Sequence, residues 1–192
     1  MNFEQIADEI QNLVDLGHLV LVAVSGFGGS GKTTLAENLR SHFGNSTLLQ
    51  LDNFLVNHGE GEGWSGGYDW QRFEQVLRDI RDGKDLHYQW YDWDKNETED
   101  WIDQPLPSLI IVEGVRILQP SLKKYYDLTI WIERSLEEST AQGKIRDRSN
   151  KIEANFDLEA HIQKWDEIWV PKEKEFAALF DPIHNADILY TY

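Results

Sequence analysis

The sequence predicts an α/β fold in which a mainly parallel sheet carries helices on both faces. A nearly all-apolar run at residues 19–24, LVLVAV, is typical of a parallel strand that is buried on both faces. A glycine-rich segment, GFGGSGKT at residues 26–33, follows this run and leads into a helical pattern. Further apolar runs alternate with helical patterns along the chain, which favours strand–helix–strand units with parallel strands.

The glycine-rich segment matches the pattern G-x-x-x-x-G-K-[ST] at every specified position, between a predicted strand and a predicted helix. This is the context of a phosphate-binding loop, or P-loop, in which backbone N–H groups and a helix N-terminus surround a polyphosphate. Lys32 is expected to reach the β- and γ-phosphates, and the Thr33 hydroxyl to ligate Mg²⁺. The alternative is a glycine-rich turn that matches by chance. The predicted nucleotide contacts in this loop are Gly26, Gly28, Gly29, Ser30, Gly31, Lys32, Thr33 and Thr34.

The composition limits the number of domains and the kinds of partner. The 192 residues suit a single domain, residues 1–192, with no room for a second full domain. The net charge of −16, from 34 acidic and 18 basic residues, repels nucleic acid and favours a Mg²⁺-complexed nucleotide over a bare one. The sequence has no cysteine, no leader pattern and no stretch apolar enough to cross a bilayer. We therefore expect a cytoplasmic enzyme without a nucleic-acid or membrane partner.

The N-terminal part is expected to alternate helices with strands. Apolar residues at helical spacing predict a helix at residues 3–16, and Gly17 is a suitable stop. The helix after the P-loop, residues 34–40, is followed by a predicted second strand at residues 46–51. The next segment, residues 57–67, is rich in glycine and charge, so we expect a mobile loop there.

The remaining chain continues the series. A helix is predicted at residues 70–82, and the aromatic segment 85–103 is predicted to form a small insertion of one or two edge strands. Pro171 is expected to bend the last long helix. Because the strands are parallel, a ligand should bind at their carboxyl ends. The later predicted elements are strands at residues 108–113, 127–133 and 186–190 and helices at residues 136–149 and 158–180.

Two acidic residues follow predicted strands. Asp52 comes directly after the strand LLQL, where it would face the γ-phosphate and take a proton from an attacking hydroxyl or bind Mg²⁺ through water. The alternative is a turn or helix-cap aspartate, because the pair Asp52-Asn53 suits a turn. Glu113 ends the apolar run LIIV, a position from which an acid can hold Mg²⁺, although a structural role is also open.

Several short motifs occur in a characteristic order. They are GFGGSGKTT at the P-loop, LLQLDNF, YDW at residues 68–70 and again at 91–93, LIIVEG, and YDLTIWIE at residues 126–133. This order resembles uridine kinases, within a wider group that includes phosphoribulokinase, pantothenate kinase and nicotinamide riboside kinase. The resemblance covers residues 19–190 and implies an ATP-dependent small-molecule kinase with a P-loop fold, a lid at residues 142–156 and an acceptor-side insertion at residues 53–103. ATP and Mg²⁺ are the implied cofactors, and a hydroxyl of a small metabolite is the implied acceptor, a nucleoside or riboside first.

The resemblance implies roles for residues on the acceptor side. Asp52 aligns with a catalytic aspartate that contacts the acceptor hydroxyl, and Asp69 with an aspartate that binds ribose hydroxyls. Asp69 also precedes a helical run, so it could instead be an N-cap. Tyr91 and Trp93 match aromatic positions that line a base pocket, with aromatic packing between strands as the alternative. Asn96 stands nearest to a histidine of uridine kinases, so recognition of a pyrimidine ribonucleoside stays open.

A basic cluster formed by Lys144, Arg146 and Arg148 falls where the resembled family carries its lid. An arginine there would neutralise the charge that spreads onto the γ-phosphoryl oxygens. Arg146 is the best match to the lid pattern, and Arg148 is a second expected nucleotide contact. The alternative is a solvated helix face that pairs with nearby glutamates. Arg116, after the motif LIIVEG, is a candidate for binding an anionic group of the substrate.

The sequence leaves two classes of function open, a kinase and a regulatory nucleotide-binding module. In a kinase, the catalytic residues would be Asp52, Lys32 and Arg146. A regulatory module that only hydrolyses or senses ATP would need the P-loop but not the acids and aromatic residues of the acceptor side. The motifs leave open whether the chain forms a homo-oligomer.

Overall fold

The computed structural model describes residues 1–56, 59–92, 95, 97–149 and 157–192. Its centre is a five-stranded sheet of order β2-β5-β1-β6-β7, in which every pair of neighbouring strands is parallel. The strands are β1 (Val20–Ser25), β2 (Ser46–Gln50), β5 (Leu109–Glu113), β6 (Leu128–Ile132) and β7 (Ile188–Tyr190). The predicted α/β fold with a mainly parallel sheet is therefore confirmed.

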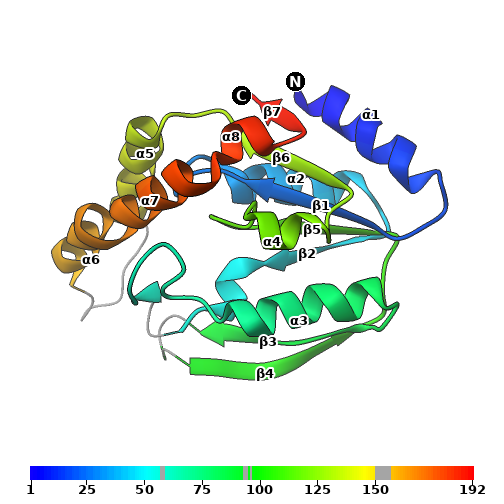
Figure 1. The fold of residues 1–192 in the computed structure, drawn as a ribbon, viewed down its shortest axis with the longest axis horizontal. Helices are drawn as coiled ribbons and strands as arrows, with labels where there is room; N and C mark the ends of the chain where they lie inside the picture. The colour runs from blue at the N-terminus through cyan, green and yellow to red at the C-terminus, as the bar shows by residue number, and fades with distance from the viewer. Residues whose placement is uncertain (57–58, 93–94, 96, 150–156) are drawn as a thin grey trace.

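Helices cover both faces of this sheet (Figure 1). One face packs against α1 (Phe3–Val14) and α2 (Lys32–His42), and the other against α3 (Trp70–Arg81) and the short helix α4 (Pro120–Lys123). Successive apolar side chains of β1 enter the two different cores, because neighbouring residues of a strand point to opposite faces. This double burial explains the uninterrupted apolar run of β1.

The aromatic segment forms a sheet of its own. Strands β3 (Leu86–Asp92) and β4 (Glu97–Gln104) pair in antiparallel fashion and lie on the far side of α3 from the main sheet (Figure 1). Tyr88 of β3 stacks on Phe54 with ring centroids 5.8 Å apart. The predicted small insertion of edge strands is therefore present, and its two strands pair with each other in a separate sheet.

The predicted long C-terminal helix is interrupted. It consists of α6 (Leu158–Lys164), a π-helical turn (Trp165–Trp169) and α7 (Val170–Phe180). Pro171 lies in the first turn of α7, where its missing N–H is tolerated, and the wider π turn directly precedes it. The predicted irregularity near this proline is therefore present, but as a π turn.

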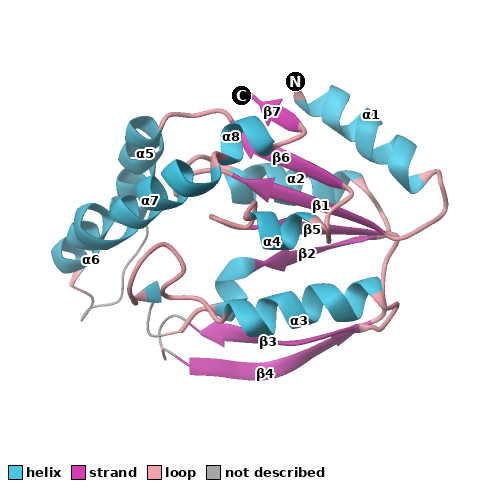
Figure 2. Ribbon diagram, viewed as in Figure 1, coloured by secondary structure: helices cyan, strands magenta, loops and turns pink. Residues whose placement is uncertain are grey.

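The carboxyl ends of the parallel strands face a group of helices. Figure 2 shows the arrowheads of β1 and β2 pointing toward the side where α5 (Leu136–Ser149), α6 and α7 gather. After α7 the chain forms the short helix α8 (Pro182–Asn185) and then β7. Within the described residues, no helix is both long and apolar enough to cross a bilayer.

The glycine-rich loop is packed against the C-terminal helices. The ring centroid of Trp64 lies 5.6 Å from that of Phe176 and 4.9 Å from that of Phe180. Residues 59–67 therefore contact α7, and the predicted mobility of this loop stays a prediction. Residues 57–58 and the lid residues 150–156 lie outside the described part of the chain.

Candidate active site

The P-loop lies between β1 and α2, as the sequence predicted. Gly31 is the N-cap of α2 with φ 104°, and Gly29 has φ 81°. Both values lie in the left-handed region that glycine adopts readily. A Cβ atom at Gly29 would also lie 2.1 Å from the carbonyl oxygen of Ser139, so the close approach of α5 excludes a side chain at this position.

A cavity of about 620 Å³ opens beside the P-loop, a volume within the range of small-molecule binding sites. Its wall comes from the P-loop, α2, α5 and the connection before α5. The lining residues are Gly29, Gly31, Lys32, Thr33, Thr34, Glu37, Asn38, Arg134, Gln142, Gly143 and Arg146. Five predicted P-loop contacts and the predicted lid arginine therefore surround one cavity.

The other predicted P-loop contacts have different surroundings. Ser30 is fully buried, and its hydroxyl has no hydrogen-bond partner among the described residues. A Cβ atom at Gly26 would lie 2.7 Å from the Ser30 hydroxyl oxygen, so these two residues pack against each other inside the loop. The N–H of Gly28 donates to a carboxylate of the protein itself, Glu173.

Glu113, at the end of β5, meets the start of α2. Its Oε1 accepts hydrogen bonds from the Thr33 hydroxyl at 3.3 Å and from the Gln50 side-chain amide at 3.1 Å. Burial raises the pKa of Glu113, an effect that the charge of Lys32 opposes and that of Asp52 reinforces. A hydroxyl and a carboxylate are the hard oxygen ligands that Mg²⁺ prefers, so this pair fits a magnesium ion that also binds phosphate oxygens and water.

Asp52 lies in a short 3-10 helix, Leu51–Phe54, that directly follows β2. The Tyr68 hydroxyl donates a hydrogen bond to Asp52 Oδ1 at 3.0 Å. Desolvation of this hydroxyl and the Asp52 charge beside it raise the pKa of Tyr68 well above its usual value, so Tyr68 stays protonated. Gln50 pairs with Glu113 in the parallel register of β2 and β5, and Asp52 follows two residues after Gln50, so the two carboxylates lie at the same end of the sheet.

One buried cation, Arg116, lies next to Tyr68 of this pair, and a second, Lys172, lies next to the loop that precedes Tyr68. The Arg116 guanidinium is 5.0 Å from the centre of the Tyr68 ring, and its Nη1 donates to the carbonyl of Trp64. Lys172 of α7 donates to two backbone carbonyls of the loop 59–67, at 3.1 and 3.0 Å. Burial and then the charge of Arg116 lower the pKa of Lys172. Both cations hold the glycine-rich loop through its backbone.

Glu173 reaches the P-loop from α7. Its two carboxylate oxygens lie 2.9 and 3.0 Å from the backbone nitrogen of Gly28. The side chain is buried, and burial raises the pKa of Glu173, whereas the charge of Lys32 and the N–H of Gly28 oppose this rise. The protein therefore places an acidic group of its own on a donor of the phosphate-binding loop.

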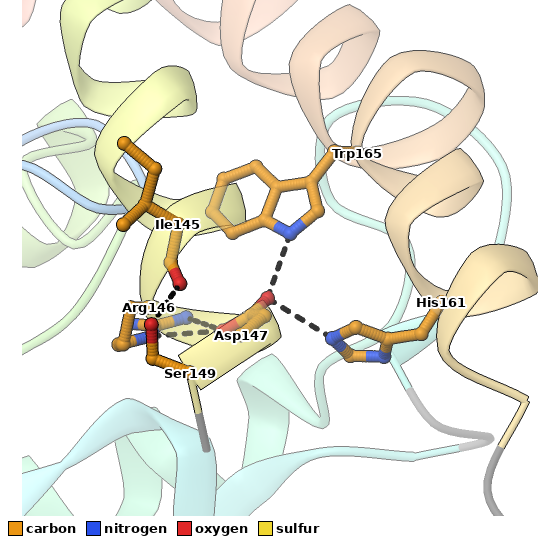
Figure 3. Close-up of polar contacts among 6 residues, drawn as sticks. All are labelled: Ile145, Arg146, Asp147, Ser149, His161 and Trp165. Atoms are coloured by element: carbon orange, nitrogen blue, oxygen red, sulfur yellow. Dashed lines mark hydrogen bonds and ion pairs between the residues drawn. The ribbon is translucent and has the colours of Figure 1, made fainter.

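Helix α5, which carries the predicted lid arginine, is held to α6 through Asp147 (Figure 3). Arg146 donates two hydrogen bonds to Asp147 Oδ1, at 2.9 and 2.7 Å, and Trp165 Nε1 donates to Oδ2 at 2.8 Å. His161 Nε2 lies 3.0 Å from the same Oδ2. Burial alone would raise the pKa of Asp147, but the hydrogen bonds from Trp165 and Arg146 hold it below its ordinary value.

The other basic residues of α5 lie differently. Lys144 forms an ion pair with Asp166 at 2.6 Å, and Arg148 is exposed and lies outside the cavity wall. The contacts described for Lys144 and Arg146 therefore go to Asp166 and to Asp147, not to the glutamates of the first turn of α5.

The predicted acceptor-side residues are only partly described. Asp69 is the N-cap of α3, and its Oδ1 accepts from the N–H of Arg72 at 3.0 Å. This is the capping alternative, and a second role toward a substrate stays a prediction. Tyr91 is a buried residue of β3. The predictions for Trp93 and Asn96 lie outside the described residues.

Sequence reasoning missed four residues that complete this arrangement. Tyr68 stands inside a recognised motif, YDW, and Asp147 follows the predicted lid arginine, so both had a local signal. Lys172 and Glu173 belong to the charged run KEKE, which is typical of a solvated helix face. Nothing local distinguishes the two buried members of this run from the two exposed ones.

Comparisons with known proteins find similarity to uridine kinases in sequence and to kinases in fold. No family model matches it. It is 23% identical to the uridine kinase of Ureaplasma parvum serovar 3. The alignment is 192 positions long and covers 89% of this chain and 88% of that relative. A solved structure described as a possible uridine kinase from Bacillus stearothermophilus has a TM-score of 0.68 at 18% identity, covering 97% of this chain and 99% of that one. The phosphoribulokinase from Rhodobacter spheroides has a TM-score of 0.60 at 15% identity, covering 91% and 70%.

The predicted resemblance to uridine kinases is therefore confirmed, and the fold is that of the P-loop kinases. These similarities, together with the matching P-loop, support an ATP-dependent small-molecule kinase. The individual roles of the predicted residues are not tested by the comparisons.

Proposed function

We propose that this chain transfers the γ-phosphoryl group of ATP to a hydroxyl group of a small metabolite, with a nucleoside or riboside as the first candidate. One observation carries this proposal. Asp52, hydrogen-bonded to Tyr68, lies beside Glu113 at the carboxyl end of the sheet, and Glu113 in turn contacts Thr33 of the P-loop. A carboxylate next to the γ-phosphate end of a P-loop suits an acceptor alcohol.

The proposed reaction uses the residues as follows. The acceptor oxygen forms the new bond to phosphorus, its proton passes to Asp52, and the bond to the β-phosphate oxygen breaks, leaving its electron pair on ADP. Lys32 and Arg146 neutralise the charge of the phosphoryl group, and they line the same cavity. Thr33 and Glu113 would hold Mg²⁺, which when bound screens the phosphate charges.

The identity of the acceptor is the finer part of the proposal. The uridine kinase relatives favour a nucleoside as the acceptor. A neighbour of the same fold is named a phosphoribulokinase, so the fold alone does not fix the acceptor. Arg116, beside Tyr68, and Lys172, at the loop 59–67, would also tolerate an acceptor with an anionic group, although both already bind backbone carbonyls.

The direct test is ADP release by the purified protein with Mg·ATP, alone and with each member of a panel of nucleosides, ribosides and small polyols. We expect ADP release to depend on at least one acceptor, and mass spectrometry to find that compound with one added phosphoryl group. Equal ADP release in the presence and absence of every acceptor would instead favour a nucleotide-hydrolysing regulatory module.

A further inference from the structure

Two consecutive residues of α7 contact the two loops of the candidate site. Lys172 donates to the carbonyl oxygens of Gly59 and Gly66 in the glycine-rich loop, and Glu173 accepts from the N–H of Gly28 in the P-loop. Both side chains are buried, with 6% of each exposed. The next two residues, Lys174 and Glu175, are exposed and repeat the same pair of residue types.

The contact at Gly28 has an electrostatic consequence. The N–H groups of a P-loop are oriented to bind the oxygens of an anion, and in this structure a carboxylate takes one of them. Burial raises the pKa of Glu173, but the charge of Lys32 and the hydrogen bond from the Gly28 N–H both favour its ionised form, so the carboxylate and a triphosphate would both interact with this lysine. A triphosphate bound by these N–H groups would lie beside the Glu173 carboxylate, and the two anions would repel each other.

The contacts of Lys172 extend to the residues beside Asp52. The loop 59–67 leads directly into Tyr68, whose hydroxyl binds Asp52. Two backbone hydrogen bonds join the chain around Tyr68 to the segment that follows Asp52. The N–H of Asp69 donates to the Phe54 carbonyl at 2.8 Å, and the N–H of Val56 donates to the Gly67 carbonyl at 3.1 Å. A shift of Lys172 would therefore be transmitted to the tyrosine that positions Asp52.

We propose that Lys172 and Glu173 are positioning residues that couple the nucleotide site to the acceptor side. In this account Mg·ATP displaces the Glu173 carboxylate from Gly28. Because Lys172 precedes Glu173 on the same helical turn, the displacement changes how Lys172 holds the loop 59–67. The coupling requires only that the P-loop binds nucleotide, while its benefit for catalysis rests on the proposed kinase function.

The first test measures affinity for the non-hydrolysable analogue Mg·AMP-PNP by calorimetry. Glu173→Gln keeps the shape and a hydrogen-bond acceptor but removes the charge, so we expect binding about 10-fold tighter than in the wild type, from the loss of one like charge near the phosphates. Glu175→Gln makes the same change on the exposed part of α7 and should leave the affinity unchanged. Glu173→Ala should also bind more tightly, which keeps the test informative if the glutamine variant folds poorly.

The second test follows backbone hydrogen exchange in residues 59–67, with and without Mg·AMP-PNP. In the wild type we expect nucleotide to change the exchange of this loop by several-fold, whereas in Lys172→Gln the loop should exchange faster and respond less to nucleotide. The matched variant Lys174→Gln should behave like the wild type. Neither measurement depends on turnover or on the acceptor, so a wrong proposal for the reaction would leave both results intact.

The coupling account is overturned by either of two results. One is unchanged or weaker nucleotide binding in both Glu173 variants. The other is a wild-type loop 59–67 whose exchange is the same with and without bound nucleotide.

Discussion

Asp52 is surrounded by groups that give it a defined orientation. Tyr68 donates to one of its oxygens, and the 3-10 helix that contains Asp52 begins where β2 ends. An aspartate that served only to cap a turn would not need a half-buried tyrosine with a raised pKa as its donor. The two readings of Asp52 that the sequence left open therefore differ in a measurable way.

We predict that Asp52→Asn lowers kcat for the acceptor-dependent reaction by about 10²- to 10⁴-fold, the usual contribution of a general base. Affinity for Mg·ATP, measured by calorimetry, should stay within a few-fold of the wild type. Asp100→Asn, at an exposed position of β4, provides the matched control and should keep full activity. Normal turnover by Asp52→Asn would show that another group, or none, takes the proton.

Residues near the P-loop were predictable because the chemistry is local in sequence. The motif identified Lys32 and Thr33, and the rule that acids at strand ends face the ligand identified Glu113. Glu173 was not predictable, since it lies 145 positions from its partner Gly28 and the packing of α7 alone brings them together. The sequence-predicted substrate role of Asp69 is still untested, and its N-cap bond is a local feature that the pattern did indicate.

At the scale of elements, α5, the helix of the predicted lid, is joined to its neighbours by one buried carboxylate. Asp147 joins Arg146 of α5 to His161 and Trp165 of the following helical segments (Figure 3). The Trp165 ring also packs on both α5 and the P-loop, because a Cβ atom at Gly143 would lie 2.3 Å from it and one at Gly28 would lie 3.0 Å from it. The lid helix, the C-terminal helices and the P-loop therefore form one packed unit.

We predict that Asp147→Asn destabilises the protein by about 1–3 kcal/mol and weakens Mg·ATP binding, because Arg146 loses its partner and buried donors lose a charged acceptor.

The folded-state pKa of Asp147 is lowered, so its contribution to the free energy of unfolding is present above the unfolded pKa and is lost as pH falls through the folded pKa. In thermal melts, the melting temperature of the wild type should exceed that of the variant at neutral pH, and this difference should disappear as pH falls below about 4. Asp166→Asn, which breaks an exposed pair with Lys144, should change stability little; an equal effect of both substitutions would contradict the role given to Asp147.

The elements themselves were predicted better than their partners. Strand and helix patterns identified the five parallel strands and α1 to α3, because burial of one helix face leaves a helical period in the sequence and burial of both strand faces leaves a continuous apolar run. They did not reveal that β3 and β4 form a separate sheet, or that a π turn divides the C-terminal helix. Both depend on contacts between distant segments, such as the stacking of Phe54 on Tyr88.

For the whole molecule, the dominant physical fact is a net charge of −16 around an anion-binding loop. The P-loop donors, Lys32 and Arg146 must attract a triphosphate inside a negative field, and Glu173 adds a further buried acid. A magnesium ion lowers the charge of the triphosphate and fits the oxygen ligands of Thr33 and Glu113. The proposed function therefore requires that nucleotide binding depend strongly on magnesium.

A calorimetric titration of ATP into the protein, with Mg²⁺ and then with EDTA, tests this central claim most directly. We predict binding of one equivalent of Mg·ATP, at least 10-fold weaker binding without the metal, and at least 100-fold weaker binding to Lys32→Met, which loses a charge-assisted contact to the phosphates. Lys174→Met, at an exposed site on α7, should bind like the wild type. The account would be contradicted by a protein that binds no purine triphosphate, or by a Lys32→Met variant that binds Mg·ATP as tightly as the wild type.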